Sequence, residues 1–541
     1  MTDELIADLE RKRPGYEAER VWHKFLMDSY LGTGGFSGAV KQPIAGHWGP
    51  AAEMYSSNAL GGVDVLDTYL DRYPREDAPK FRSRVQGTQY DNYNEALTDT
   101  KLSYVLRKEF EPRNIPDVIR EWRQDVDGRG TTWTDLRGNN ALVAAVLGWR
   151  PMLIDARAMP RDEKGNALIL NAAQARDAGM RPYPVPLFPA NLLDYILDDV
   201  GQFTYVKLCT TSQRKASWRG ERETVTHYTI WTPTHFEKYE VTEGKGGKTA
   251  VLVDEGPHTF GLVPLVIYQH KAGPEDPVLA LPMHANVAQA SRAHLNRMSE
   301  FNEHLRGQVF ALLVVASKGG QLSEDLTVGT DNALPIDTES RQPHAFIAPP
   351  GTVADTYEKR LESIVREMYR VARVEYTRPT GGISSGEAHA YEFAQTNAAL
   401  ADFAKQLARA EDDVDFFVGR YYGVPDDELQ AASNVPPDTF DIENLTADIK
   451  DAFDIIAGNV GPTATKLLKL RLIDQAFPRL DADTRKTIEA ELDDEDAQDA
   501  ADEAAAAEAE AARLDAEEAA RLAAAEAAAR GNVTTPEPAA A

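Results

Sequence analysis

Apolar side chains recur at helical intervals in the first part of the chain, up to about residue 156. One stripe comprises Trp22, Phe25, Leu26 and Tyr30, and a second comprises Val63, Leu66 and Leu70. Positions three and four apart lie on one face of a helix, so each stripe predicts an amphipathic helix. Further on, the apolar run 141–147 meets Gly148 and then the segment PMLIDA. This order predicts a helix, a turn and a buried strand.

Between about residues 183 and 270 the pattern changes to alternation, which is the period of a β-strand. Four strands are predicted, at 203–208, 224–231, 235–241 and 249–253. The glycine-rich segment EGKGGK joins the last two and predicts a hairpin. The segment FGLVPLVIYQH follows, and its Pro264 predicts an edge strand or a bend because proline lacks a backbone N–H. This section therefore predicts a small antiparallel β subdomain.

From residue 282 onward, three long apolar stripes predict long helices. The stripes comprise, in turn, Val287, Ala290, Met298, Phe301 and Leu305; Val353, Tyr357, Leu361, Ile364, Met368 and Ala372; and Phe393, Leu400, Phe403, Leu407, Val414, Phe417 and Tyr421. The third predicts a helix of roughly 35 residues, about 50 Å long. A β-rich insert separates the first two helices, and the segment TRPTGGISSGEA separates the second and third. The whole pattern predicts an α+β fold that is mostly helical.

Length and charge narrow the function classes. The chain has 541 residues, more than one compact core holds, so two to four domains are expected. Its net charge of -28 repels phosphate backbones and disfavours a conventional basic-groove nucleic-acid binder. A single cysteine, Cys209, excludes a disulfide framework and a multi-cysteine zinc site. The longest apolar run, 309–316, is too short to cross a bilayer, and no secretion signal is visible, so a soluble protein in a reducing compartment is expected.

The C-terminal part carries a large share of the acidity. Residues 491–530 contain 14 acidic residues and three arginines, a net charge of -11. Alanine and glutamate favour helix, but this stretch has almost no large apolar side chains to bury. It predicts a solvated helical or partly disordered tail. Identical helices standing side by side in a ring are the alternative.

Several motifs resemble reactive sites, but each lacks a part that its chemistry requires. GKGGKT has Thr242 where a phosphate-binding loop needs a glycine, and a hairpin surrounds it. Residues 382–386 match G-x-S-x-G around Ser384, yet a nucleophile elbow follows a buried strand and here a helix is predicted before it. The segment DVDG at 125–128 lacks the spacing of a calcium loop and predicts a polar turn.

The histidines and the cysteine add no reactive site. His284, His294 and His304 are ten residues apart on one predicted helix, not at the i, i+4 spacing of a metal pair. Cys209 lies in a β-rich run and is expected to be a small buried apolar residue. The sequence therefore predicts no catalytic residue, no metal site and no cofactor.

The chain resembles the portal proteins of tailed double-stranded DNA phages, both in the order of its predicted elements and in several short sequence segments. The segments GYEAERVWHKFLMDSYLG, YLDRYPRED, FRSRVQGTQYDNYN, GWRPMLIDA, RPYPVPLFPANLLDYI, FGLVPLVIY and LPMHANVAQASRAHLNRMSEF are similar to stretches of many portals. The resemblance spans roughly residues 10 to 490 and does not include the Ala/Glu-rich tail.

The resemblance implies the parts of a portal protomer. They are a wing (1–279, with the β subdomain from about 183), stem helix 1 (280–306), a clip (307–350), stem helix 2 (351–374), a tunnel loop (375–387), a long wing helix (388–424), wing end and crown helices (425–490), and an acidic crown extension or tail (491–541).

The resemblance also implies a function without catalysis. Twelve copies (in some portals thirteen) would form a homo-oligomeric ring at the capsid vertex of the virion, after assembly in the host cytoplasm. Double-stranded DNA would pass non-specifically through the ring during packaging and ejection. The terminase large subunit and later a head-tail adaptor would dock on the clip, with major capsid and scaffolding proteins as further partners and no membrane involved.

Two sets of residues are candidate sites under this interpretation. The tunnel loop would face DNA with Arg378, Thr380, Gly381, Gly382, Ser384, Ser385 and Gly386, where the glycines permit the loop to project and shift. An ordinary helix–helix connection is the alternative. The second set, on stem helix 2, comprises Lys359, Arg360, Arg366 and Arg370. These cations would contact DNA or a neighbouring subunit, or simply pair within the helix, as Glu362 and Arg366 are placed to do.

Two other function classes stay open at this point. A cytoplasmic scaffold built from a helical bundle would explain the helices without any DNA passage. A serine hydrolase using Ser384 would explain the G-x-S-x-G match.

Overall fold

A computed structural model describes most of the chain up to residue 440 and short helical pieces beyond it. The described residues are 2–36, 68–107, 109–156, 179–309 without 216, 221, 245–246 and 275, then 312–317, 333–337, 345–347, 351–374, 386–437, 440, 469–470, 487–488, 490–492, 505 and 508–525. The chain divides into two compact units, residues 1–440 and 441–541. The predicted helix at 63–70 falls largely outside the described residues.

The first part of unit one is helical, as its apolar stripes predict. Its helices are α1 (Thr2–Glu10), α2 (Tyr16–Leu31), the 3-10 turn η1 (Gly34–Phe36), α4 (Ala78–Gly87), α5 (Tyr93–Arg107), α6 (Asp117–Gln124) and α7 (Trp133–Leu147). A capping box between Thr132 and Asp135 starts α7. Gly148 ends it with φ 98°, and a Cβ there would lie 2.3 Å from the Ala280 carbonyl oxygen. The predicted sequence of helix, turn and buried strand at 141–156 is confirmed.

The predicted antiparallel strands form one five-stranded meander. It consists, in spatial order, of β4 (Leu192–Leu197), β5 (Phe203–Lys215), β6 (Arg222–Trp231), β7 (His235–Gly244) and β8 (Gly247–Pro257). Gly244 and Gly247 face each other at the β7–β8 turn, so the predicted hairpin is confirmed.

A second sheet takes strands that the sequence pattern assigned to the first. β2 (Trp149–Ala156) lies between β3 (Pro182–Pro186) and β9 (Leu265–Gln269), antiparallel to both. The edge position that Pro264 predicted is confirmed, but β9 is an edge of this sheet and not of the meander. Pro264 uses its carbonyl oxygen, which accepts a 2.8 Å hydrogen bond from the Ile154 N–H. The meander therefore starts at Leu192, because β3 pairs with β2.

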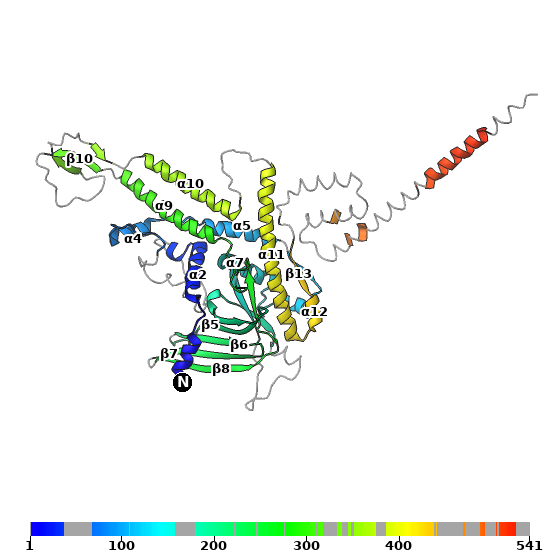
Figure 1. Cartoon of the computed structure of the whole chain (residues 1–541), viewed down its shortest axis with the longest axis horizontal. Coiled ribbons are helices and arrows are strands. Elements are labelled where there is room, and N and C mark those ends of the chain that lie inside the picture. Colours follow the sequence, from blue (N-terminus) through cyan, green and yellow to red (C-terminus); the bar gives the residue numbers. More distant parts are fainter. Residues whose placement is uncertain are drawn as a thin grey trace, which may run out of the picture. The chain divides into compact units, whose positions relative to one another are not determined.

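Two long helices bracket a small sheet in the next part. α9 (Ala285–Val309) leads to β10 (Leu312–Ser317), β11 (Ala333–Asp337) and β12 (Ala345–Ile347), and α10 (Thr352–Ala372) follows. β10 is central, parallel to β11 and antiparallel to β12. Figure 1 shows α9 and α10 side by side, with β10 beyond their ends. Unit one is thus a mixed α/β structure with several sheets.

Helix α11 (Gly386–Tyr422) runs through the middle of unit one and has 37 residues, in agreement with the predicted length. It contacts β2, β9, α5 and α6, and also α12 (Asp426–Ala431) and β13 (Ser433–Val435), which pairs with β1 (Glu111–Arg113). Its buried apolar face comprises Leu400, Phe403, Leu407, Val414, Phe417 and Val418. These side chains belong to the largest apolar core of the chain.

Two buried ion pairs fix α11 to the helices before it. Glu411 is fully buried and accepts hydrogen bonds from Arg137 of α7, one of them 2.8 Å long. Asp415, one turn later, pairs with Arg123 of α6 and accepts a 3.0 Å bond from the Asn434 side chain. Burial raises the pKa of Asp415 to about 6 even with the arginine beside it. Charged residues within an apolar face were not predicted from the sequence.

The longest described segment of unit two is a solvated helix. Residues 508–525 are helical, and every side chain in them is exposed, Leu514 and Leu522 included. This agrees with the predicted solvated helical tail over that range.

Breaking one buried pair should destabilise unit one strongly. Glu411→Gln leaves the buried guanidinium of Arg137 without a counter-charge, so we expect the free energy of unfolding to fall by about 3–5 kcal/mol in chemical denaturation. Replacing both partners with Arg137→Met and Glu411→Leu should recover most of that loss. As a surface control, Glu362→Gln on α10 should cost less than about 1 kcal/mol. Equal losses for the two single variants would contradict the assigned anchoring.

Candidate functional site

The sequence places its candidate residues on α10 and in the segment between α10 and α11. α10 packs along α9 with one apolar face, and the two helices share aromatic contacts towards their β10 ends. The Phe301 and Tyr357 rings lie 5.9 Å apart, and Tyr357 also lies beside His304. At the opposite end, Leu97 of α5 packs with Val287, Ile364, Met368 and Ala372. The apolar face of α10 therefore faces the protein, and its charged face is exposed.

Two of the candidate cations on α10 are paired within the helix. Arg366 lies 3.4 Å from Glu362, as the i, i+4 alternative predicted. Arg370 donates two hydrogen bonds to Glu367, of 2.8 and 2.6 Å, and these bonds lower the pKa of that carboxyl group. Exposed pairs of this kind add little stability, but they neutralise charge locally.

The other two candidates on α10 differ from Arg366 and Arg370 in that they have no described acidic partner. Lys359 and Arg360 are exposed, and neither forms an ion pair with any residue that the structure describes. They are the two basic residues of α10 that have no acidic partner among the described residues.

Helices α9 and α10 are almost neutral even though the chain is acidic. α10 contains four acidic and four basic side chains, and α9 contains two acidic residues and three arginines. The excess negative charge of the chain, -28 in total, therefore lies outside these two helices.

Most of the predicted tunnel loop lies outside the described residues. This applies to Arg378, Thr380, Gly381, Gly382, Ser384 and Ser385, while Gly386 is the first residue of α11. The described elements before and after this segment are the helices α10 and α11, and the residues directly before Gly382 lie outside the described part of the chain. Thr396 of α11 donates a 2.7 Å hydrogen bond to the carbonyl oxygen of Arg373 at the end of α10. This bond ties together the two helices that the segment connects.

Buried basic side chains lie close together around Lys101 of helix α5. Helix α5 contacts α9, α10 and α11, and its Lys101 is only 7% exposed. Burial, with a smaller effect from Arg373, lowers the pKa of Lys101 to about 8. Burial also lowers the pKa of His270 to about 4 and that of His284 well below its usual value. No described carboxylate offsets these shifts. Lys101 and His270 were not predicted as site residues from the sequence.

The remaining sequence candidates have structural roles. His284 and His294 are buried, and the described residues contain no cluster able to hold a metal ion. Cys209 is buried at 3% exposure. The Asp125 carboxylate accepts hydrogen bonds from the N–H groups of Gly128 and Gly130, which makes the predicted polar turn. No helix within the described ranges is long and apolar enough to span a membrane.

Comparison with known proteins leaves the chain without a family assignment. Neither the models of protein families nor the curated proteins include a match to it.

Lys101 should make stability depend on pH between 8 and 10.5. Below pH 8 the lysine is charged in both the folded and the unfolded state, so the folded state carries the full cost of burying the charge. Between its folded pKa of about 8 and its unfolded pKa of 10.5, only the folded state releases the proton, so the free energy of unfolding rises with pH. Lys101→Met should therefore stabilise the protein at pH 7, by at most about 3 kcal/mol, and lose this advantage above pH 10.5. Chemical denaturation of Lys101→Met and of the unmodified protein at pH 7 and at pH 10.5 measures the stability difference under each condition.

Lys359→Met is the matched control for this experiment, because Lys359 is exposed on α10. It should change stability by less than about 0.5 kcal/mol at either pH. A pH-independent effect of Lys101→Met would contradict the assigned burial cost.

Proposed function

We propose that the chain is a portal-type protein, in which twelve copies form a closed ring at one capsid vertex of a phage and double-stranded DNA is packaged and ejected through the central channel. The observation that carries this proposal is the order of elements from α9 to α11. Two side-by-side helices bracket a three-stranded sheet, and a short connection then leads into a helix of 37 residues. Portals resemble this order, with stem helix, clip, stem helix, tunnel loop and wing helix.

The charges of the stem are compatible with a channel through which DNA slides. Each contact between a lysine or arginine and a phosphate adds to DNA affinity by releasing counterions. On α10, Arg366 and Arg370 are paired with glutamates, which leaves fewer cations to hold the backbone. Under the proposal, Lys359 and Arg360 are the stem positions that touch the DNA backbone or an acidic group of the adjacent subunit.

The proposal assigns partners to the parts of the protomer. The terminase large subunit docks on residues 307–350 during packaging, and a head-tail adaptor binds there afterwards. Major capsid and scaffolding proteins surround the wing. The protein resides at the portal vertex of the virion after assembly in the host cytoplasm, and it acts as a conduit and not as an enzyme.

A portal protomer should assemble into closed rings. Native mass spectrometry of the purified full chain should give a dominant species of twelve subunits, or thirteen, because a heterologous interface closes at one number. Negative-stain images should show annular particles with a central opening. A monomer, a dimer or an open series of sizes would reject the proposal and favour a helical scaffold.

The connection between α10 and α11 should be needed for DNA retention. Gly381→Pro combined with Gly382→Pro restricts the backbone, so we expect rings to form while packaged DNA per particle falls at least about tenfold. Ser384→Ala combined with Ser385→Ala is the matched control in the same segment and should package normally. Normal packaging by the proline variant would remove the assigned role. Covalent labelling by an acylating probe that Ser384→Ala abolishes would instead indicate a hydrolase.

A further inference from the structure

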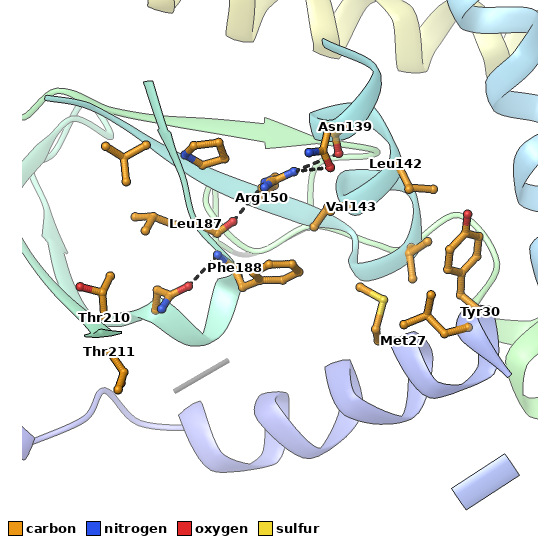
Figure 2. Close-up of a pocket in the computed structure, with 15 residues that line it drawn as sticks. Met27, Tyr30, Asn139, Leu142, Val143, Arg150, Leu187, Phe188, Thr210 and Thr211 are labelled. Atoms are coloured by element: carbon orange, nitrogen blue, oxygen red, sulfur yellow. Dashed lines mark hydrogen bonds between the residues drawn. The ribbon is translucent and has the colours of Figure 1, made fainter. Parts of the chain in front are cut away.

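A cavity of about 380 Å³ lies among α2, α7, the β3–β4 connection and β5 (Figure 2). We call it the α2–α7 pocket. Its lining residues are Met27, Tyr30, Leu31, Asn139, Leu142, Val143, Val146, Arg150, Val185, Pro186, Leu187, Phe188, Asn191, Thr210 and Thr211. The volume lies at the lower end of the range for small-molecule sites, which excludes large ligands.

One wall of this pocket is a buried arginine whose hydrogen-bond partners are all neutral. Arg150, on β2, is 4% exposed. Its Nε donates to the Leu187 carbonyl oxygen at 3.2 Å, and its Nη1 donates to the carbonyl and side-chain oxygens of Asn139 at 3.0 and 3.2 Å (Figure 2). Its Nη2 has no hydrogen-bond partner among the described residues. The guanidinium carbon lies 5.5 Å from the centre of the Phe188 ring.

Other buried arginines of this chain have a carboxylate partner. Arg84 pairs with Glu76 at 2.7 Å, and Arg137 pairs with Glu411. Arg150 forms no ion pair with any described residue. Burial lowers the pKa of Arg150 to about 10, so the side chain is still charged at neutral pH. A buried charge without a counter-ion costs several kcal/mol of stability, and a bound anion would offset that cost.

The other walls of the pocket indicate which chemical group a bound anion would carry besides its charge. Nine of the fifteen lining residues have purely apolar side chains. Two of the polar residues already have hydrogen-bond partners. Tyr30 donates to Asp99, and the Asn191 side chain accepts from the Phe188 N–H and donates to the Cys209 carbonyl oxygen. A small, fully hydrated anion would leave the apolar walls uncovered, whereas a hydrocarbon group would cover them.

From these observations we propose that the α2–α7 pocket binds a small amphipathic organic anion. Its single negative group pairs with Nη2 of Arg150, and its hydrocarbon part lies against Met27, Leu142 and Phe188. A medium-chain carboxylate has this chemistry. This site is independent of the proposed channel function, because all its residues lie outside α9, α10 and α11.

Octanoate, octanol and octylammonium have the same hydrocarbon chain and differ in the charge of the head group, so they test the proposal. Isothermal titration of the full-length protein should give saturable binding of octanoate, at least about tenfold weaker binding of octanol and none of octylammonium, since a charge-assisted bond accounts for the difference. Equal affinity for octanoate and octanol, or no octanoate binding, would overturn the proposal.

Two variants locate the site. Arg150→Met keeps the approximate size of the side chain and removes the charge, and it should weaken octanoate binding at least about tenfold. Leu31→Glu places a negative charge on a lining residue that is 37% exposed, so folding is preserved and the anion is repelled. If Arg150→Met does not fold, Leu31→Glu decides the question alone.

Val200→Glu is the matched control, because it makes the same kind of change at a valine that is 80% exposed and outside the pocket. It should bind octanoate as the unmodified protein does. Unchanged octanoate binding by Leu31→Glu, or an equal loss in Val200→Glu, would place the ligand elsewhere and overturn the proposal.

Discussion

Helix α11 is held by two carboxylates that sit inside an otherwise apolar interface. Its stripe of leucine, phenylalanine, valine and alanine repeats every three to four residues, so a shift by one turn would again bury apolar side chains. Such a shift would separate Glu411 from Arg137 and Asp415 from Arg123, leaving four charges buried without partners. Two apolar pairs would hold the helix about as well but would not select one position along its axis. We infer that the ion pairs set the register of α11, and with it the position of the sheets and helices that α11 contacts.

The distribution of charge has a second consequence. The two helices α9 and α10 are close to neutral, whereas residues 491–530 alone carry -11. Pairs such as Arg370 with Glu367 leave few cations available, so these helices offer a passing polyanion neither strong attraction nor strong repulsion. The proposed channel function would require that balance, because tight phosphate contacts would hold the duplex in place. Net charge by itself would have indicated repulsion along the whole protein.

Two buried cations stand apart from the ion pairs that stabilise unit one. Lys101 lies on α5, which contacts α9, α10 and α11, whereas Arg150 lines the α2–α7 pocket. Neither pairs with a described carboxylate. Their physical states differ, since burial brings the pKa of Lys101 to about 8 while that of Arg150 stays near 10. The lysine can therefore lose its proton when its environment becomes more apolar, but the arginine remains a cation that needs an acceptor. Only the arginine also borders a cavity, and this makes it the better candidate for binding.

The sequence by itself indicated helix or strand where the apolar pattern was strong, as in α7, β5 to β8, α10 and α11. The spacing in α10 and α11 and the alternation in β5 to β8 are local properties, because apolar periodicity reports which face of a single element is buried. The sequence also anticipated the Glu362–Arg366 pair, since both residues lie on one helix. Only the tertiary structure decided that β9 joins β2 instead of the meander, that Glu411 meets Arg137, and that Arg150 lines a cavity with residues from α2, α7 and β5. Each of these contacts joins residues far apart in the chain, and no local pattern encodes the partner of a strand edge or of a buried charge.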